Sequence, residues 1–171
     1  MVPQARAEER ELAVAGRREL LADLARAVAP GSALQLLAVI RLHGLSALRD
    51  RAGTDARDGL VEEARQRALV DVGRAGTVYV SRKDEVCILL DGSFMESISK
   101  LANLTWSLNE LGRPHNVAAE TGVALLPEEA DDPIGALRRA DSRTVPGEYT
   151  KHDWDSADRR ARRSATDPPG A

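Results

Sequence analysis

The chain has 171 residues, with 24 Lys and Arg against 27 Asp and Glu, which gives a formal net charge of -3. This length fits one domain of ordinary size with loose ends, and the charge excludes a protein that binds nucleic acid through bulk positive charge. Hydrophobic residues make up 43% of the chain and aromatic residues only 3%, so we expect a core packed from aliphatic side chains.

Cysteine content and hydropathy indicate the cellular compartment of the protein. Cys87 is the single cysteine, which excludes an internal disulfide framework and a zinc site built from cysteines. No apolar run approaches the roughly 20 residues needed to cross a bilayer, and the N-terminus is charged where a signal peptide is apolar. These features predict a soluble, cytoplasmic protein without membrane contact.

The first half of the chain predicts a helix, a strand, two helices and a hairpin. Apolar residues at helical spacing predict an amphipathic helix over 8–28, and the nearly continuous apolar run over 33–42 predicts a central strand covered on both faces. Two helices, over 45–51 and 56–72, follow this strand. The strands of the hairpin cover 77–80 and 86–90, with a polar loop at 81–85.

The second half predicts a helix, a strand and a last helix before the chain loses periodicity. Ser93 caps a helix that ends at about Leu111, and the stretch 117–126 has strand character. Asp131-Asp132-Pro133 starts a last helix through Ala140, with Asp before Pro as expected at a helix start. The predicted order is therefore α-β-α-α-β-β-α-β-α. The segment after 146 is polar and charged, which predicts a flexible tail whose arginines are solvated, with no nucleic-acid partner.

Four sequence patterns occur in one order. Residues 41–61 match "DLDGFKxINDxxGHxxGDxLL" without a gap, and Gly44, Asp50, Gly53, Asp58 and Leu60 coincide. Residues 82–90, RKDEVCILL, are similar to "GGDEFxxLL". Further along, 120–127 are similar to "SxGxAxxP" and 136–141 to "LLxxAD". Over roughly residues 20 to 145 the chain thus resembles the GGDEF family of diguanylate cyclases.

This resemblance implies an α+β, ferredoxin-like nucleotide-cyclase fold, in which helices flank a central, mostly antiparallel sheet. It divides the chain into an N-terminal amphipathic helix at 1–30, a degenerate GGDEF domain at 31–145 and a flexible charged tail at 146–171.

The resemblance also implies that the catalytic site is lost. In active members two carboxylates hold divalent metal against the triphosphate of GTP, and the matching residues are Arg41 and Asp84. An arginine cannot bind a cation. Arg82 and Lys83 replace the two glycines that let the hairpin backbone approach the phosphates.

Other family positions have changed as well. The Asn and Asp that recognise guanine match Arg49 and Asp58, so half of that pair is kept. No lysine occurs between Lys100 and Lys151, where the phosphate-binding lysine is expected, and Gly73 and Gly76 replace the Arg and Asp of the allosteric RxxD motif.

We therefore expect no catalytic residue, no metal site and no cofactor. The expected function is that of an inactive GGDEF-like regulatory module that acts by protein-protein interaction in bacterial signalling. The remnant active-site positions are Arg41, Leu42, Arg49, Asp58, Arg82, Lys83, Asp84 and Glu85. We further hypothesise that Arg41 pairs with Asp84 or Glu85, which places a guanidinium where the metal would be.

Two alternatives stay open. The first is a metal-independent sensor of GTP, cyclic di-GMP or another nucleotide, whose ligand-binding residues would be Arg41, Arg49, Asp58, Arg82 and Lys83. The second is a residual enzyme that uses Asp84 and Glu85 as acid and base.

The sequence says less about the protein partner and about the remaining candidate residues. The protein partner is unidentified, and a homodimer is an open alternative. Trp106 marks a contact surface or packs at a helix edge. His43, His115 and His152 form no recognisable metal site, and Cys87 is interpreted as a buried small hydrophobe.

Overall fold

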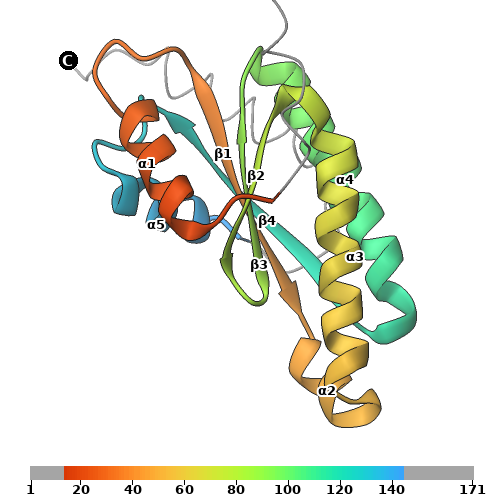
Figure 1. The fold of residues 1–171 in the computed structure, drawn as a ribbon. Coiled ribbons are helices and arrows are strands. Elements are labelled where there is room, and N and C mark those ends of the chain that lie inside the picture. The colour runs from red at the N-terminus through yellow and green to blue at the C-terminus, as the bar shows by residue number, and fades with distance from the viewer. Residues whose placement is uncertain (1–13, 145–171) are drawn as a thin grey trace, which may run out of the picture.

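A four-stranded antiparallel sheet lies between two layers of helices in the computed structural model, which describes residues 14–144 (Figure 1). The strands lie in the order β2-β3-β1-β4. Their bounds are β1 Gln35–His43, β2 Gly76–Arg82, β3 Glu85–Leu90 and β4 Ala118–Leu126. The helices are α1 Arg17–Ala27, α2 Leu45–Ala52, α3 Thr54–Val72, α4 Phe94–Gly112 and α5 Pro133–Asp141. This order of elements and the α+β fold class confirm the sequence-based prediction.

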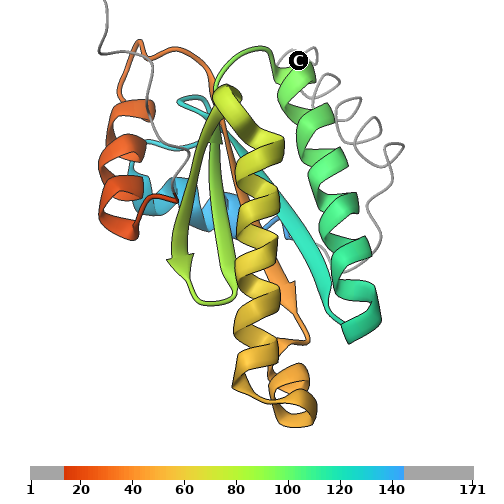
Figure 2. The ribbon, with the colours of Figure 1, turned by 45° about the vertical axis from the view of Figure 1, so that its right-hand side comes forward.

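Strand β1 is apolar from Leu36 to Ile40 because helices cover both of its faces. Leu36, Ala38 and Ile40 belong to the core cluster shared with α3 and α4, whereas Leu37 and Val39 belong to the cluster shared with α1 and α5. Figure 2 shows the two helical layers on opposite sides of the sheet. The prediction of a central strand buried on both faces is confirmed.

The start of the first helix differs from the prediction. Residues 8–13 lie outside the described part of the chain, and α1 begins at Arg17, after Gly16 in an extended conformation. Ala15 instead pairs with the edge of β2: its N–H donates to the Val78 carbonyl at 2.9 Å and its carbonyl accepts from the Val80 N–H at 2.8 Å. These hydrogen bonds favour an extended backbone where the apolar periodicity predicts a helix.

The hairpin is tighter than the predicted loop at 81–85. Strand β2 continues to Arg82 and β3 begins at Glu85, so the turn consists of Lys83 and Asp84. The β2–β3 register shifts between Val80 and Arg82, which marks a bulge. Glu85 therefore belongs to a strand and is buried, rather than exposed at a hairpin tip.

The outer edge of β4 is covered by side chains. The Asn109 amide on α4 accepts from the Ala119 N–H at 2.9 Å and donates to the Ala119 carbonyl at 3.2 Å, as a neighbouring strand would. Further along, Glu129 accepts from the Leu125 N–H at 2.7 Å, and Arg143 donates to the Val123 carbonyl at 3.1 Å. These side chains satisfy backbone groups that an open edge would leave unpaired.

Glu129 and Arg143 also pair with each other. Two guanidinium nitrogens of Arg143 lie 2.6 and 2.8 Å from the two carboxylate oxygens of Glu129. Burial of Glu129 opposes its ionisation, but the hydrogen bonds from Arg143 and Leu125 outweigh burial and lower the pKa of this carboxyl. The ionised form is therefore the one that stabilises the fold.

Two further observations concern the rest of the chain. No helix within residues 14–144 is long and apolar enough to cross a membrane. The tail predicted at 146–171, including His152, lies outside the described residues.

We predict that Asn109→Ala lowers the free energy of unfolding by about 1–3 kcal/mol, because it leaves the Ala119 N–H and carbonyl without their partner. Chemical denaturation measures this change. Asn103→Ala, an identical substitution at an exposed position of α4, is the matched control. Equal losses in the two variants would show that the amide does not stabilise the β4 edge.

We predict that Glu129→Gln destabilises the protein by about 1 kcal/mol at pH 7, where the charge-assisted pair is intact. Because the pKa of Glu129 is lowered on folding, its contribution is present above the pKa of the unfolded chain and is lost as the pH falls through the folded value. Unfolding curves from pH 7 to pH 2 should therefore converge with those of the wild type at acid pH. The exposed neighbour Glu128, changed to Gln, serves as the control; a gap that persists at low pH would contradict this assignment.

Candidate functional site

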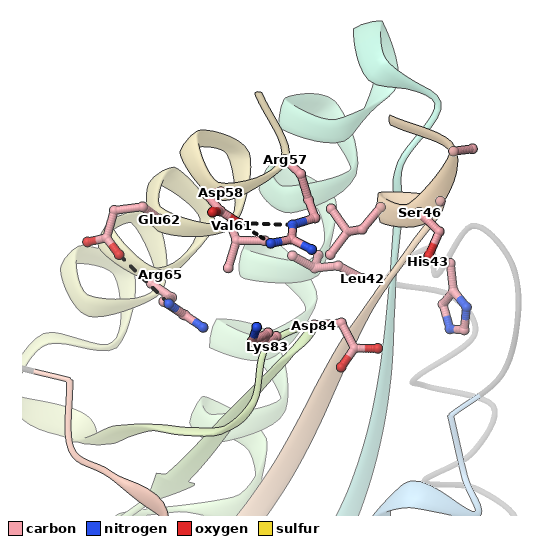
Figure 3. A pocket seen from close by; sticks show the side chains of 13 residues that line it. Leu42, His43, Ser46, Arg57, Asp58, Val61, Glu62, Arg65, Lys83 and Asp84 are labelled. Carbon is pink, nitrogen blue, oxygen red and sulfur yellow. Dashed lines mark hydrogen bonds and ion pairs between the residues drawn. The ribbon is translucent and has the colours of Figure 1, made fainter. Parts of the chain in front are cut away.

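An open pocket of about 880 Å³ lies between the hairpin turn, the end of β1 and helices α2 and α3 (Figure 3). Four of the predicted remnant positions line it: Leu42, Asp58, Lys83 and Asp84. Three cationic side chains also line the pocket, two from α3 and one from the hairpin: Arg57, Arg65 and Lys83. The structure thus brings part of the predicted site together.

The two arginines of α3 differ in how they are neutralised. The Nε and Nη2 groups of Arg57 both donate to one carboxylate oxygen of Asp58, at 2.8 and 2.6 Å. The nearest acid to Arg65 is Glu62, whose carboxylate lies 3.9 Å from the guanidinium. The charge of Arg57 is therefore closely paired, whereas that of Arg65 is only loosely paired.

Arg41 lies on the opposite face of the sheet from this pocket. Successive side chains on a strand point to opposite faces, so Leu42 faces the pocket and Arg41 faces the layer formed by α1 and α5. Cross-strand pairing sets Arg41 directly opposite Glu85 on β3 and Glu120 on β4. Directly opposite residues share a face, so this register gathers charged side chains at one end of the sheet.

Two carboxylates lie near the guanidinium of Arg41, and one of them is within hydrogen-bond distance. One is Asp141 at the end of α5, which accepts a hydrogen bond from Nη2, and the other is Glu85, 3.9 Å from the same nitrogen. Of the two acids hypothesised to pair with Arg41, Glu85 lies within ion-pair distance but accepts no hydrogen bond from it, and Asp84 lines the pocket instead. The stronger partner, Asp141, lies 100 residues away in sequence, and no local pattern points to it.

Gly122 on β4 allows α5 to approach closely enough for this contact. A Cβ atom at residue 122 would lie 1.9 Å from the carbonyl oxygen of Ala140, one residue before Asp141. Only a glycine leaves room for that carbonyl. The glycine of the "SxGxAxxP" pattern is therefore needed for helix packing beside Arg41.

A second polar pair lies at this end of the sheet, and its histidine, His43, also lines the pocket. His43 Nε2 is 2.5 Å from a carboxylate oxygen of Glu120, which is buried. Glu85 is buried too, and it accepts a weak hydrogen bond from the Cys87 thiol at 3.5 Å. Burial, reinforced by the Glu85 carboxylate, raises the pKa of Cys87. Cys87 is thus a buried, protonated thiol, as predicted.

The remaining predicted positions do not join either group. Arg49 is exposed on α2 and lies 3.3 Å from the Asp50 carboxylate, and Arg82 is exposed at the end of β2. The predicted cluster of Arg41, Arg49, Asp58, Arg82 and Lys83 is therefore not a single site, because only Asp58 and Lys83 line the pocket. The alternation of side chains along β1 separates Arg41 from them.

The residues present do not fit a metal centre. The guanidinium of Arg41 donates to Asp141 and lies 3.9 Å from Glu85, so a fixed positive charge already stands beside both acids. Among residues 14–144, no group of three or more His, Cys, Asp or Glu side chains is placed to hold a metal ion. Asp84 and Glu85 also lie apart, one in the pocket and one against Arg41, which does not suit an acid and base acting together.

Sequence reasoning missed Arg57, Arg65 and Asp141. The helical spacing of Arg57, Val61 and Arg65 places these three residues on one face of α3, and this periodicity was the available signal for two of the missed cations.

Comparisons with known proteins give a structural likeness only. No protein-family model matches the sequence, and no curated protein matches it. The GGDEF domain of DgcB from Caulobacter crescentus, solved in complex with c-di-GMP, superposes with a TM-score of 0.65 and 16% identity, covering 80% of this chain and 86% of that one.

Two further solved structures agree. The GGDEF domain of YfiN, also called TpbB, from Pseudomonas aeruginosa gives a TM-score of 0.62 at 20% identity, covering 77% of this chain and 88% of that one. The active GGEEF domain of a diguanylate cyclase from Vibrio cholerae gives 0.62 at 16% identity, covering 76% and 88%. The strand order, the helical layers and these superpositions together show that residues 14–144 have the fold of GGDEF domains.

Proposed function

We propose that this protein is a catalytically inactive GGDEF-like regulatory module that acts by protein-protein interaction in bacterial signalling. The observation that carries the proposal is the environment of Arg41. Its guanidinium stands at the position that matches a metal-binding carboxylate of the family, and Asp141 and Glu85 hold it there. A divalent cation at the same end of the strand would meet a fixed positive charge.

The hairpin turn supports the same proposal. Lys83 and Asp84 form the turn where the family has a glycine and a metal-binding acid. A lysine side chain fills space that glycine would leave for the phosphates, and its positive charge next to Asp84 disfavours a metal at that acid. Loss of the metal removes the main source of charge stabilisation in phosphoryl-type transfer.

The exposed surface is consistent with a role in binding protein. Trp106 is 64% exposed on α4, and Met95 on the same helix is 48% exposed. Exposed tryptophan side chains are enriched at protein interfaces. The exposure of Trp106 therefore favours a contact surface over packing at the helix edge.

One observation favours a second candidate function, metal-independent nucleotide sensing. Asp58, the one kept member of the guanine-recognition pair, lies in the pocket beside Arg57, with Arg65 and Lys83 nearby. Cationic side chains can carry out part of the charge neutralisation that a metal provides. Binding of GTP or cyclic di-GMP without Mg²⁺ and without turnover would favour this candidate.

We predict that the purified protein forms no cyclic di-GMP from GTP with Mg²⁺ or Mn²⁺, since Arg41 prevents the metal from binding where the reaction requires it. Chromatography of the reaction mixture measures the product. An active diguanylate cyclase assayed in parallel is the positive control. Metal-dependent product above the enzyme-free blank would contradict the proposal.

We predict that Arg41→Ala increases the affinity for Mn²⁺ by about tenfold, because it removes a positive charge beside Glu85 and Asp141. Water-proton relaxation measures Mn²⁺ binding directly. Arg74→Ala, at an exposed position away from the site, is the matched control. The assignment of Arg41 as the charge that excludes the metal fails if the two variants bind Mn²⁺ equally.

A further inference from the structure

Arg65 has unused hydrogen-bonding capacity. Its side chain is 20% exposed, and the nearest carboxylate oxygen, on Glu62, is 3.9 Å from Nη1, beyond hydrogen-bond distance. Its Nε–H is buried and has no hydrogen-bond partner among the described residues. In the part of the chain that the structure describes, the Arg65 side chain therefore makes no close polar contact that a ligand at its exposed end would have to break.

Lys83 lies opposite Arg65 at the same end of the pocket. It comes from the hairpin turn, whereas Arg65 comes from α3, and the guanidinium of Arg65 points toward Lys83 (Figure 3). Within residues 14–144, no ion pair involves Lys83. Two cations that converge from separate elements repel each other unless an anion lies between them. This geometry selects an anionic ligand.

The total charge of the pocket lining indicates how much negative charge the anionic ligand carries. Three carboxylates, those of Asp58, Glu62 and Asp84, accompany the three cations, so the formal charge of the lining is zero with His43 neutral. A triphosphate without metal carries several negative charges and would face these carboxylates. A single carboxylate carries one charge and matches a guanidinium in a bidentate arrangement.

From these contacts we propose that Arg65 and Lys83 form a clamp for one carboxylate, and that its ligand is an acidic side chain, Asp or Glu, of a protein partner. The proposal rests on the proposed function of the module, namely that it acts by protein contact. Arg65 exchanges its long contact with Glu62 for a bidentate pair with the partner's carboxylate. Lys83 closes over the same carboxylate from the hairpin. Arg57 takes no part, because Asp58 already holds it.

The test is a titration followed by NMR of the arginine Nε–H signals. The probe is tetraglutamate capped at both ends, and capped tetraglutamine is its neutral control. We expect tetraglutamate to shift the Arg65 signal saturably and tetraglutamine to leave it unchanged. Arg65→Gln and Lys83→Gln should each weaken the binding of tetraglutamate at least about tenfold, whereas Arg74→Gln should leave it unchanged. In these variants, binding is measured through the backbone amide signals of the hairpin and α3. Lys83 is exposed on a turn, so its variant tests the clamp even if Arg65→Gln fails to fold.

Three results would overturn the proposal. The first is the absence of any saturable shift with tetraglutamate. The second is undiminished binding by Lys83→Gln. The third is tighter binding of GTP or inorganic phosphate than of tetraglutamate at the same signals, which would identify a site for small phosphorylated ligands. None of these results involves product formation. An inactive protein that fails to bind tetraglutamate therefore contradicts the clamp alone, and formation of cyclic di-GMP contradicts the proposed function.

Discussion

The pairing of β1 with β3 on one side and β4 on the other constrains the rest of the structure. Both faces of β1 are buried, so a shift of one residue would exchange the side chains of its two faces and break both core clusters. This register fixes Leu42 toward the pocket and Arg41 toward α5. The positions of Arg41, His43, Glu85 and Glu120 follow from it.

The consequence is that the predicted remnant positions and their neighbours divide into two groups with different chemistry. On the face of α5, Arg41 donates to Asp141 with Glu85 at 3.9 Å, and His43 lies against Glu120, so Arg41 and His43 each have a close polar partner. On the face of α3, Arg65 and Lys83 have no close acidic partner among the described residues. The first group stabilises the fold, because unpaired buried charges are costly. The second retains the capacity to bind a ligand.

Much of the fold could be predicted from local patterns, whereas the site depended on contacts between distant residues. The apolar run of β1, the Ser93 cap of α4 and the Asp132–Pro133 start of α5 are local signals, and the structure follows them. Ala15 departs from its helical pattern because it pairs with β2. Glu85 is buried because the hairpin turn is shorter than its polar sequence indicates. The contact of Arg41 with Asp141 requires Gly122 and the packing of α5, which no spacing along the chain shows.

The GGDEF-domain fold is shared with an active cyclase from Vibrio cholerae, so the fold leaves activity undecided and the residues at the site must decide it. The central claim is that Arg41 replaces the metal rather than accompanying it. Isothermal titration of the protein with GTP, with and without Mg²⁺, tests this most directly. The account predicts that the heat of GTP binding is the same with and without Mg²⁺. Binding of GTP that requires Mg²⁺ would contradict it.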